Sequence, residues 1–265
     1  MNTYDAVLVG GGIMSATLAV LLHELDPFMK ILLIERLCSP GLESSAAKNN
    51  AGTGHAANCE LNYTPKLRNG QIDVKKALSI NAAFELSLEF WASLTSQERL
   101  EPNKFLNQVP HISFVWGEED LAFLKQRFAQ INIYEAFSDM TFSSDPSEIN
   151  EWMPLVMKGR DLNQKIGATK IDRGTDIDFG ALTRAYIEPL LREGCLEVIY
   201  STEVVNLYRN SDSKWNITLK NKQSNNEIKS SFVFLGCGGG SLSLLQRSKI
   251  PEGFGYGGFP VSGQW

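Results

Sequence analysis

The feature that most constrains this sequence is a glycine-rich turn between an apolar strand and an apolar helix. Ala6–Val9 is a short apolar run that leads into Gly10-Gly11-Gly12, and along Ile13–Leu25 the apolar residues recur at helical spacing. Asp26-Pro27 stops the helix, and Ile31–Ile34 is a second strand without a polar residue. A fully apolar short strand is typical of a parallel sheet that is covered on both faces. The sequence therefore predicts a βαβ unit of an α/β fold.

The turn has the spacing of a dinucleotide-binding fingerprint. Gly10 permits the tight turn, Gly12 lets a pyrophosphate approach the backbone, and the helix that begins at Ile13 presents amide donors and a partial positive charge. Ser15 stands where the fingerprint has its third glycine, which allows close packing of helix and strand. Glu35 ends the second strand, where a carboxylate can hydrogen-bond ribose hydroxyls and disfavours the 2′-phosphate of NADP. We therefore predict a site for the ADP half of a dinucleotide.

A long segment with little periodicity follows, over residues 39–70. Loops of this length inside a compact domain are usually functional. Residues 44–55, which read Ser-Ser-Ala-Ala-Lys-Asn-Asn-Ala-Gly-Thr-Gly-His, offer small side chains with hydroxyl and amide donors. This composition suits a segment that runs along the pyrophosphate and ring edge of a cofactor. A flexible surface loop would have the same composition, so both interpretations stay open.

The rest of the chain predicts a second, inserted domain followed by a return to the first. Helices are expected at 75–94 and 121–131, with a strand at 112–116 and a composition rich in charge and aromatic residues up to about residue 160. After Gly180 we expect a helix over 182–191 that is kinked near Pro189. Four strands follow, at 196–200, 204–209, 215–220 and 227–235, and the last runs into the glycine-rich stretch 236–240.

Composition excludes several classes of function. Twenty-five basic and thirty acidic residues give a net charge of −5 without a basic cluster, so no nucleic-acid partner is expected. The cysteines are scattered and predict reduced thiols in a cytoplasmic protein, with neither disulfides nor a metal site: Cys38, Cys59, Cys195 and Cys237. No apolar run approaches the roughly 20 residues of a membrane span, so any membrane contact is expected to be peripheral.

Three histidines are candidates for acid–base chemistry. His23 lies near the end of the first predicted helix and is expected to be a surface or capping residue. His55 ends the small-residue loop, and His111 enters a strand after Pro110; each is either structural or a base. Because no histidine pair has metal-ligand spacing and no GxSxG or Ser/His/Asp set is present, hydrolase and metalloenzyme functions have little support.

Several blocks of the sequence resemble the malate:quinone oxidoreductase family. They cover nearly the whole chain in the order that the family has them: Val9-Gly-Gly-Gly-Ile-Met-Ser-Ala-Thr-Leu18, Asn49-Asn-Ala-Gly-Thr-Gly-His55, Glu60-Leu-Asn-Tyr-Thr-Pro65, Val109-Pro-His-Ile-Ser-Phe-Val-Trp-Gly117, Pro154-Leu-Val-Met-x-Gly-Arg-Asp161, Gly174-Thr-Asp176 and Gly257-Gly-Phe-Pro-Val-x-Gly-Gln264. The family in turn resembles the wider group of amino-acid and hydroxy-acid flavoprotein oxidases.

This resemblance implies both a fold and an activity. The fold is a discontinuous Rossmann-like FAD-binding domain, with a mixed sheet and a β-meander, interrupted by an α+β substrate domain. Residues 1–75 and 166–250 would form the FAD-binding domain, and residues 76–165 and 251–265 an incomplete substrate domain. The activity is oxidation of (S)-malate to oxaloacetate with non-covalent FAD, and with electrons passed to membrane quinone in the tricarboxylic acid cycle. The enzyme would be cytoplasmic, with peripheral contact to the membrane.

The predicted site residues fall into two groups. Those expected to contact FAD are Gly10, Gly11, Gly12, Ile13, Met14, Ser15, Glu35, Arg36, Ser44, Ser45, Asn50, Ala51, Gly52, Thr53, Gly54, Val204, Gly236 and Gly238. The resemblance implies that Val204 lies with its backbone against the adenine. For catalysis, His55 is the first candidate for the base that accepts the malate C2 hydroxyl proton, and His111 is the second. Lys170 is a candidate for binding a substrate carboxylate, with a solvated lysine as the alternative. No metal ligands are predicted.

The resemblance also sets an expectation about length. Members of the family are nearly twice as long, and this sequence stops at Trp265 directly after its last matching block. We therefore expect part of the substrate sheet, and a glycine-rich segment that closes over the flavin, to be missing. Three hypotheses follow: a quinone-reducing FAD-dependent malate dehydrogenase, a catalytically inactive FAD- or ADP-binding fragment, and a related 2-hydroxy-acid oxidase that uses oxygen.

Overall fold

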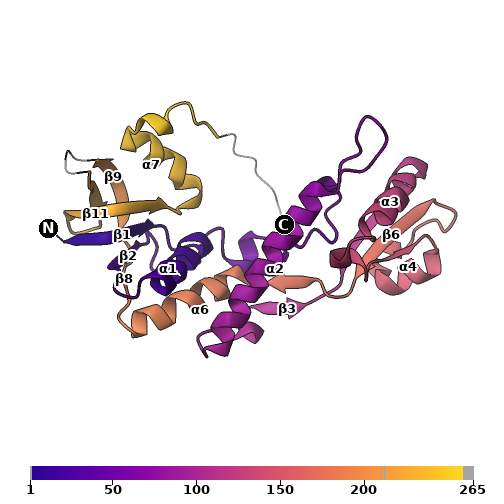
Figure 1. Ribbon diagram of the computed structural model, residues 1–265, viewed down its shortest axis with the longest axis horizontal. Helices are drawn as coiled ribbons and strands as arrows, with labels where there is room; N and C mark the ends of the chain where they lie inside the picture. The colour runs from indigo at the N-terminus through magenta and orange to yellow at the C-terminus, as the bar shows by residue number, and fades with distance from the viewer. Residues whose placement is uncertain (1, 210, 212, 259–265) are drawn as a thin grey trace. The chain divides into compact units, whose positions relative to one another are not determined.

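The computed structural model describes residues 2–209, 211 and 213–258, which form two compact units (Figure 1). Unit 1 comprises the described residues within Met1–Gly52, Glu98–Phe105 and Asp178–Trp265, and unit 2 comprises Thr53–Gln97 and Leu106–Ile177. Most of the last block that carries the family resemblance, from residue 259 onward, lies outside the described residues.

Unit 1 is built on a six-stranded mixed sheet. Its strands, in the order β8-β2-β1-β11-β10-β9, are β8 (Leu196–Ile199), β2 (Ile31–Ile34), β1 (Thr3–Val9), β11 (Asn225–Leu235), β10 (Trp215–Lys220) and β9 (Glu203–Arg209). The first four strands of this order are parallel, and β11, β10 and β9 form an antiparallel meander. Val9 lies opposite both Ile34 and Leu235, so the carboxyl ends of β1, β2 and β11 meet at one edge of the sheet.

Helices cover both faces of this sheet, with α1 (Ile13–Leu25) and α6 (Phe179–Arg192) on one side and α7 (Ser241–Ser248) on the other (Figure 1). This double cover explains why all four residues of β2 are apolar and buried. Helix α6 starts where the Asp178 carboxylate accepts a hydrogen bond from the Ala181 amide at 2.8 Å, and it remains helical through Pro189.

Unit 2 combines helices with two small antiparallel sheets. The helices are α2 (Lys75–Ser96), α3 (Glu118–Ile131), α4 (Pro146–Trp152) and α5 (Pro154–Met157). One sheet has the order β4-β6-β5, with β4 (His111–Trp116), β6 (Ile166–Ile171) and β5 (Thr141–Ser143), and the other pairs β3 (Leu106–Gln108) with β7 (Thr175–Ile177).

Single 3₁₀ turns of the chain, in both units, occupy Ala47–Asn49, Leu61–Tyr63, Pro102–Lys104, Glu135–Phe137, Gly238–Gly240 and Pro251–Gly253.

The bounds of the two units differ from the predicted division of the chain. Residues 53–75 and 166–177 pack within unit 2, because Ala57 shares a core with Ile131 and Phe137, and because β6 is the central strand of the three-stranded sheet. Residues 98–105 and the described part of 251–265 pack within unit 1.

The elements predicted from hydrophobic periodicity are present. The βαβ unit of β1, α1 and β2 is confirmed, as are the helices and strands predicted elsewhere, with shifts of a few residues at their ends. Strand β6 was missed because Gly167, Ala168 and Thr169 are small, and a Cβ on Gly167 would lie 2.6 Å from a methyl carbon of Leu121. Among the described residues, no helix has both the length and the apolar character that a membrane crossing requires.

Candidate functional site

A cavity of about 770 Å³ lies in unit 1 where the parallel strands β1, β2 and β11 end. It is lined by the segments that follow these strands, by residues 41–45 and 202–204, and by α7. Ligands of open α/β sheets bind at the carboxyl ends of the strands, and small-molecule and cofactor sites occupy roughly 300–1,000 Å³. Position and volume together make this cavity the candidate site.

The glycine turn after β1 forms one side of the cavity. Gly10 has φ +95°, and a Cβ on it would lie 2.6 Å from Cα of Cys237, so the turn and the end of β11 approach closely only because this residue is glycine. Ile13 and Met14 line the cavity. The first turn of α1 therefore presents its backbone amides and the positive end of its dipole to the cavity.

Ser15 lies beneath this turn and not in the cavity lining. Its side chain is fully buried, and a Cβ on Gly236 would overlap its hydroxyl oxygen. Helix α1 and strand β11 thus pack closely because Gly236 supplies the space that the third glycine of the fingerprint usually provides. The Ser15 hydroxyl has no hydrogen-bond partner among the described residues.

The Glu35 carboxylate is buried beside the turn. Oε2 accepts a hydrogen bond from the Gly11 amide at 2.5 Å, and Oε1 accepts one from the Leu37 amide at 2.7 Å. An ionised carboxylate offers about four acceptor positions, so Glu35 keeps capacity for further donors. Burial, followed by the charges of Glu35 and Glu188, raises the pKa of the Tyr200 hydroxyl, which therefore stays neutral beside the carboxylate.

The small-residue loop contributes part of its length to the cavity. Ser44 and Ser45 line it, and the Ser45 hydroxyl accepts a hydrogen bond from the Ile13 amide at 3.0 Å, which caps α1. Asn50 holds the loop from within, since its amide nitrogen donates to the carbonyls of Ser44 and Ala46 and its oxygen accepts from the Gly52 amide. Asn50, Ala51 and Gly52 are outside the cavity lining.

The far side of the cavity combines predicted and unpredicted residues. Val204, Gly236 and Gly238, which are among the predicted cofactor-binding residues, line it, and Arg36 lines it while its guanidinium pairs with Glu43 at 2.6 Å. Lining residues that the sequence analysis missed include Thr202, Cys237, Ser241, Leu244 and Arg247. Helix α7 carries the last three of these; it has only eight residues, it follows a run of three glycines at 238–240, and the sequence analysis did not predict it.

The remaining predicted residues lie in unit 2. Thr53 forms an isolated β-bridge with Asp176, and the Gly54 amide donates to the Thr175 carbonyl at 2.9 Å. His55 is exposed, and its Nδ1 lies 2.9 Å from Oε1 of Glu60. A partner on Nδ1 fixes the tautomer of a neutral imidazole and leaves Nε2 as its acceptor.

His111 and Lys170 are already engaged by the protein. The His111 ring is buried against Gly174, and its Nε2 lies 3.0 Å from the Thr175 carbonyl oxygen and 3.2 Å from the Thr175 amide nitrogen. The Lys170 ammonium pairs with Asp172 at 2.8 Å and lies over the ring of Trp152. Both side chains hold neighbouring elements of unit 2 in place.

A buried arginine that sequence reasoning missed organises the segment around His55. Arg127 of α3 is fully buried and donates to the Thr64 hydroxyl at 2.9 Å and to the carbonyls of Ala57 and Asn58 at 3.2 and 3.4 Å. Burial lowers the pKa of Arg127 to about 10, which leaves it charged at neutral pH. Burial, followed by the charge of Glu60, raises the pKa of the Cys59 thiol in this segment to about 11.

Comparison with known proteins decides the family. A family profile described as malate:quinone oxidoreductase matches residues 2–265. The chain belongs to this family. Relatives named "Probable malate:quinone oxidoreductase" are 60% identical in Prochlorococcus marinus (strain MIT 9211) and 59% identical in Synechococcus sp. (strain RCC307), each over 264 residues. These matches cover 100% of this chain but 53% and 55% of the two relatives, so the chain spans about half the length of the malate:quinone oxidoreductases it matches.

Solved structures share the fold of this chain. An L-α-glycerophosphate oxidase from Mycoplasma pneumoniae, solved with FAD bound, has a TM-score of 0.69 at 19% identity over 94% of this chain and 58% of that chain. A glycine oxidase from Geobacillus kaustophilus has a TM-score of 0.68 at 20% identity over 93% and 58%. The predicted α/β fold with a mixed sheet is therefore shared with these two oxidases, the first of which was solved with FAD bound.

Proposed function

We propose that unit 1 binds FAD by its ADP half and serves an FAD-dependent oxidation of (S)-malate to oxaloacetate. Membrane quinone would accept the electrons, as part of the tricarboxylic acid cycle, which requires peripheral contact with the membrane. The observation that carries the proposal is the coincidence of family membership with a cavity that has a glycine turn on one side and a buried carboxylate beside it. Either alone would be weaker support.

The residues present fit the ADP half of the cofactor. A side chain at Gly10 would clash with Cys237, where β1 and β11 approach each other. Because Gly10 has none, no side chain covers the backbone at the place where a diphosphate would lie. The first amides of α1 face the same space, and Glu35 retains acceptor capacity for ribose hydroxyls. Val204 and Leu244 offer an apolar surface for an adenine.

We further propose a division of labour between the two units. Unit 1 would be the FAD-binding domain, interrupted in sequence by unit 2 as the substrate domain. Relative to the predicted division, this assignment moves residues 53–75 and 166–177 to the substrate side, and residues 98–105 and the described part of 251–265 to the FAD-binding side. It rests on the location of the cavity, which is lined only by segments of unit 1 among the described residues.

His55 is the proposed base for malate. Bound FAD supplies the acceptor for the hydride that leaves C2. Glu60 holds Nδ1 of His55, so Nε2 is the atom that would take the proton of the C2 hydroxyl, and the Glu60 carboxylate would stabilise the imidazolium that results. The exposed imidazole is accessible to a substrate. Lys170 would have to exchange Asp172 for a malate carboxylate to serve as a binding residue.

A second candidate function is cofactor binding without turnover. It is favoured by one observation: the chain spans about half the length of its relatives. Absorbance spectroscopy of the purified chain with FAD, followed by malate-dependent reduction of a quinone analogue or dye, separates the two. Bound flavin with malate-dependent reduction supports oxidation, and bound flavin without it supports binding alone. Absence of FAD binding contradicts both, and peroxide release in place of quinone reduction would indicate an oxygen-using oxidase.

A further inference from the structure

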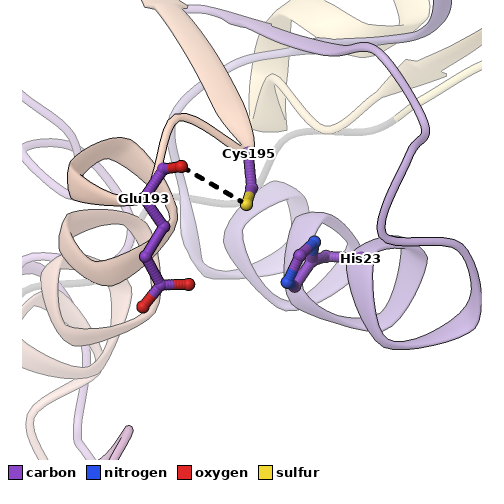
Figure 2. A group of neighbouring side chains, drawn as sticks. All are labelled: His23, Glu193 and Cys195. Atoms are coloured by element: carbon purple, nitrogen blue, oxygen red, sulfur yellow. Dashed lines mark hydrogen bonds between the residues drawn. The ribbon is translucent and has the colours of Figure 1, made fainter.

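Three potential metal ligands from distant parts of the sequence meet in unit 1 (Figure 2). His23 belongs to the last turn of α1, Glu193 follows the last residue of α6, and Cys195 leads into β8. An imidazole nitrogen, a carboxylate oxygen and the sulfur atom all lie within 4.8 Å of one another. No spacing signal links these residues, which is why the sequence predicted no metal site.

The backbone fixes two of the three ligands in one tight turn. The Glu193, Gly194 and Cys195 amides donate to the carbonyls of Pro189, Leu191 and Leu190 at 3.0, 3.1 and 2.9 Å. Gly194 has φ +73°, as expected for the glycine that ends a helix in this way. Helix α1 packs along α6, and this packing brings His23 to the turn. The three side chains are therefore presented by packed secondary structure and not by a free loop.

The ligand types and their spacing suit zinc. Thiolate, imidazole and carboxylate bind Zn²⁺ at about 2.3, 2.0–2.1 and 2.0–2.2 Å, so their ligand atoms stand roughly 3.3–3.6 Å apart around a tetrahedral ion. Rotation of the side chains would bring the three ligand atoms, which all lie within 4.8 Å of one another, to these separations. Because His23 and Cys195 are half-buried and Glu193 is exposed, the fourth position would be open to water.

We propose that His23, Glu193 and Cys195 form a zinc site that ties the end of α1 to the turn between α6 and β8. Binding would replace the thiol proton of Cys195 with the metal ion and release that proton to solvent. The weak hydrogen bond from this thiol to the Glu193 carbonyl, at 3.8 Å, would be given up. The role is structural, because none of the three residues lines the cavity. The proposal is therefore independent of the proposed function.

Titration of the purified chain with Co²⁺ tests this site. We expect one tetrahedral Co²⁺ per chain, with a near-ultraviolet thiolate-to-cobalt band, and we expect one equivalent of Zn²⁺ to abolish the signal. Cys195→Ser should remove the thiolate band, while His23→Gln and Glu193→Gln should each weaken Zn²⁺ binding at least tenfold. Cys38→Ser, which changes an exposed thiol outside the cluster, should bind metal like the parent chain.

Thermal unfolding supplies a second readout. Zn²⁺ in hundredfold excess over its Kd should raise the Tm of the parent chain by about 5 °C and leave that of Cys195→Ser unchanged. The site is overturned if the parent chain binds no stoichiometric metal at micromolar concentration, or if Cys195→Ser and His23→Gln retain its affinity, which would mean adventitious surface binding. In either case FAD binding should be intact, so failure here is distinguishable from failure of the proposed function.

Discussion

The glycine turn of unit 1 and the 53–64 segment of unit 2 hold their functional groups by different means. At the turn, the groups are backbone amides, and the ends of β1, β2 and β11 fix their positions. The 53–64 segment has few regular elements, and other elements supply many of its hydrogen bonds, through Arg127 of α3, Asn81 of α2, Ser113 of β4 and the Thr175 backbone of β7. A site built from backbone amides tolerates changes of side chain except where there is no space for them, whereas a segment held by a few hydrogen bonds from distant elements depends on the residues that make those bonds.

Replacement of the buried arginine should have the largest effect. Arg127→Met removes the donor to the Thr64 hydroxyl and to the carbonyls of Ala57 and Asn58, and leaves these buried acceptors unpaired. We expect the free energy of unfolding to fall by about 4 kcal/mol and amide exchange across residues 53–64 to rise. Urea unfolding and hydrogen exchange measure the two effects.

Arg173→Met is the matched control for that variant. Arg173 forms ion pairs with Asp139 and Glu85, but its side chain is partly exposed. The substitution should therefore lower the free energy of unfolding by at most about 1 kcal/mol. Equal losses for Arg127→Met and Arg173→Met would show that the buried network does not hold the segment.

A substitution in the glycine turn should weaken FAD binding only where the new side chain has no space. In Gly10→Ala, the new Cβ would lie 2.6 Å from Cα of Cys237, at a φ of +95°. We expect FAD affinity to fall about 100-fold, or about 2.7 kcal/mol, because the turn must move away from the end of β11. Fluorescence titration with FAD measures the change.

Gly255→Ala separates strain from lost space. Gly255 also has a positive φ, +83°, but its Cβ would meet nothing within 4 Å. Gly255→Ala should lower the free energy of unfolding by about 1 kcal/mol through backbone strain, and FAD affinity should stay within roughly twofold of the parent. If Gly10→Ala lowered FAD affinity no more than Gly255→Ala, the turn would not be the place where the diphosphate binds.

The same difference explains what could be predicted from the sequence. The β1–α1–β2 unit and Glu35 were predictable because strand, turn, helix and acid follow one another within 35 residues and each leaves a periodic or compositional signal. Arg127, Arg247 and the approach of His23 to Cys195 were not, because each depends on the packing of elements far apart in sequence. Strand β6 was missed because its central residues are small, and no periodic pattern connects residues 53–75 with unit 2.

Glu35 should have an effect of intermediate size. Each oxygen of its carboxylate accepts a backbone amide, from Gly11 and from Leu37. Glu35→Gln turns one acceptor into a donor that faces an amide and removes the charge available to the ribose hydroxyls. We expect about a tenfold loss of FAD affinity, or about 1.4 kcal/mol. An unchanged affinity in calorimetric titration would exclude Glu35 from the cofactor site.

The smallest predicted effect is a pH dependence carried by Cys59. Burial, with Glu60 as the next cause, raises the pKa of its thiol from 9.0 to about 11. The folded thiol stays neutral while the unfolded thiol ionises, so the stability present below pH 9 is lost as the pH rises towards 11. The loss at pH 10 should be about 1 kcal/mol.

Urea unfolding at pH 8 and pH 10 checks this dependence. Between pH 8 and pH 10, the free energy of unfolding should fall by about 1 kcal/mol less in Cys59→Ala than in the parent chain. In Cys38→Ala, which changes an exposed thiol, the difference should equal that of the parent. An equal fall in the free energy of unfolding between pH 8 and pH 10 for the parent and Cys59→Ala would show that the thiol does not titrate as a buried group.

The backbone-built cavity of unit 1 should bind the ADP half of the cofactor without help from the 53–64 segment. Hydrogen exchange of the purified chain with and without ADP tests it most directly. We predict protection at residues 10–15, 35–37 and 236–240, with residues 53–64 unchanged. No protection in the first three segments, or protection confined to residues 53–64, would contradict the account.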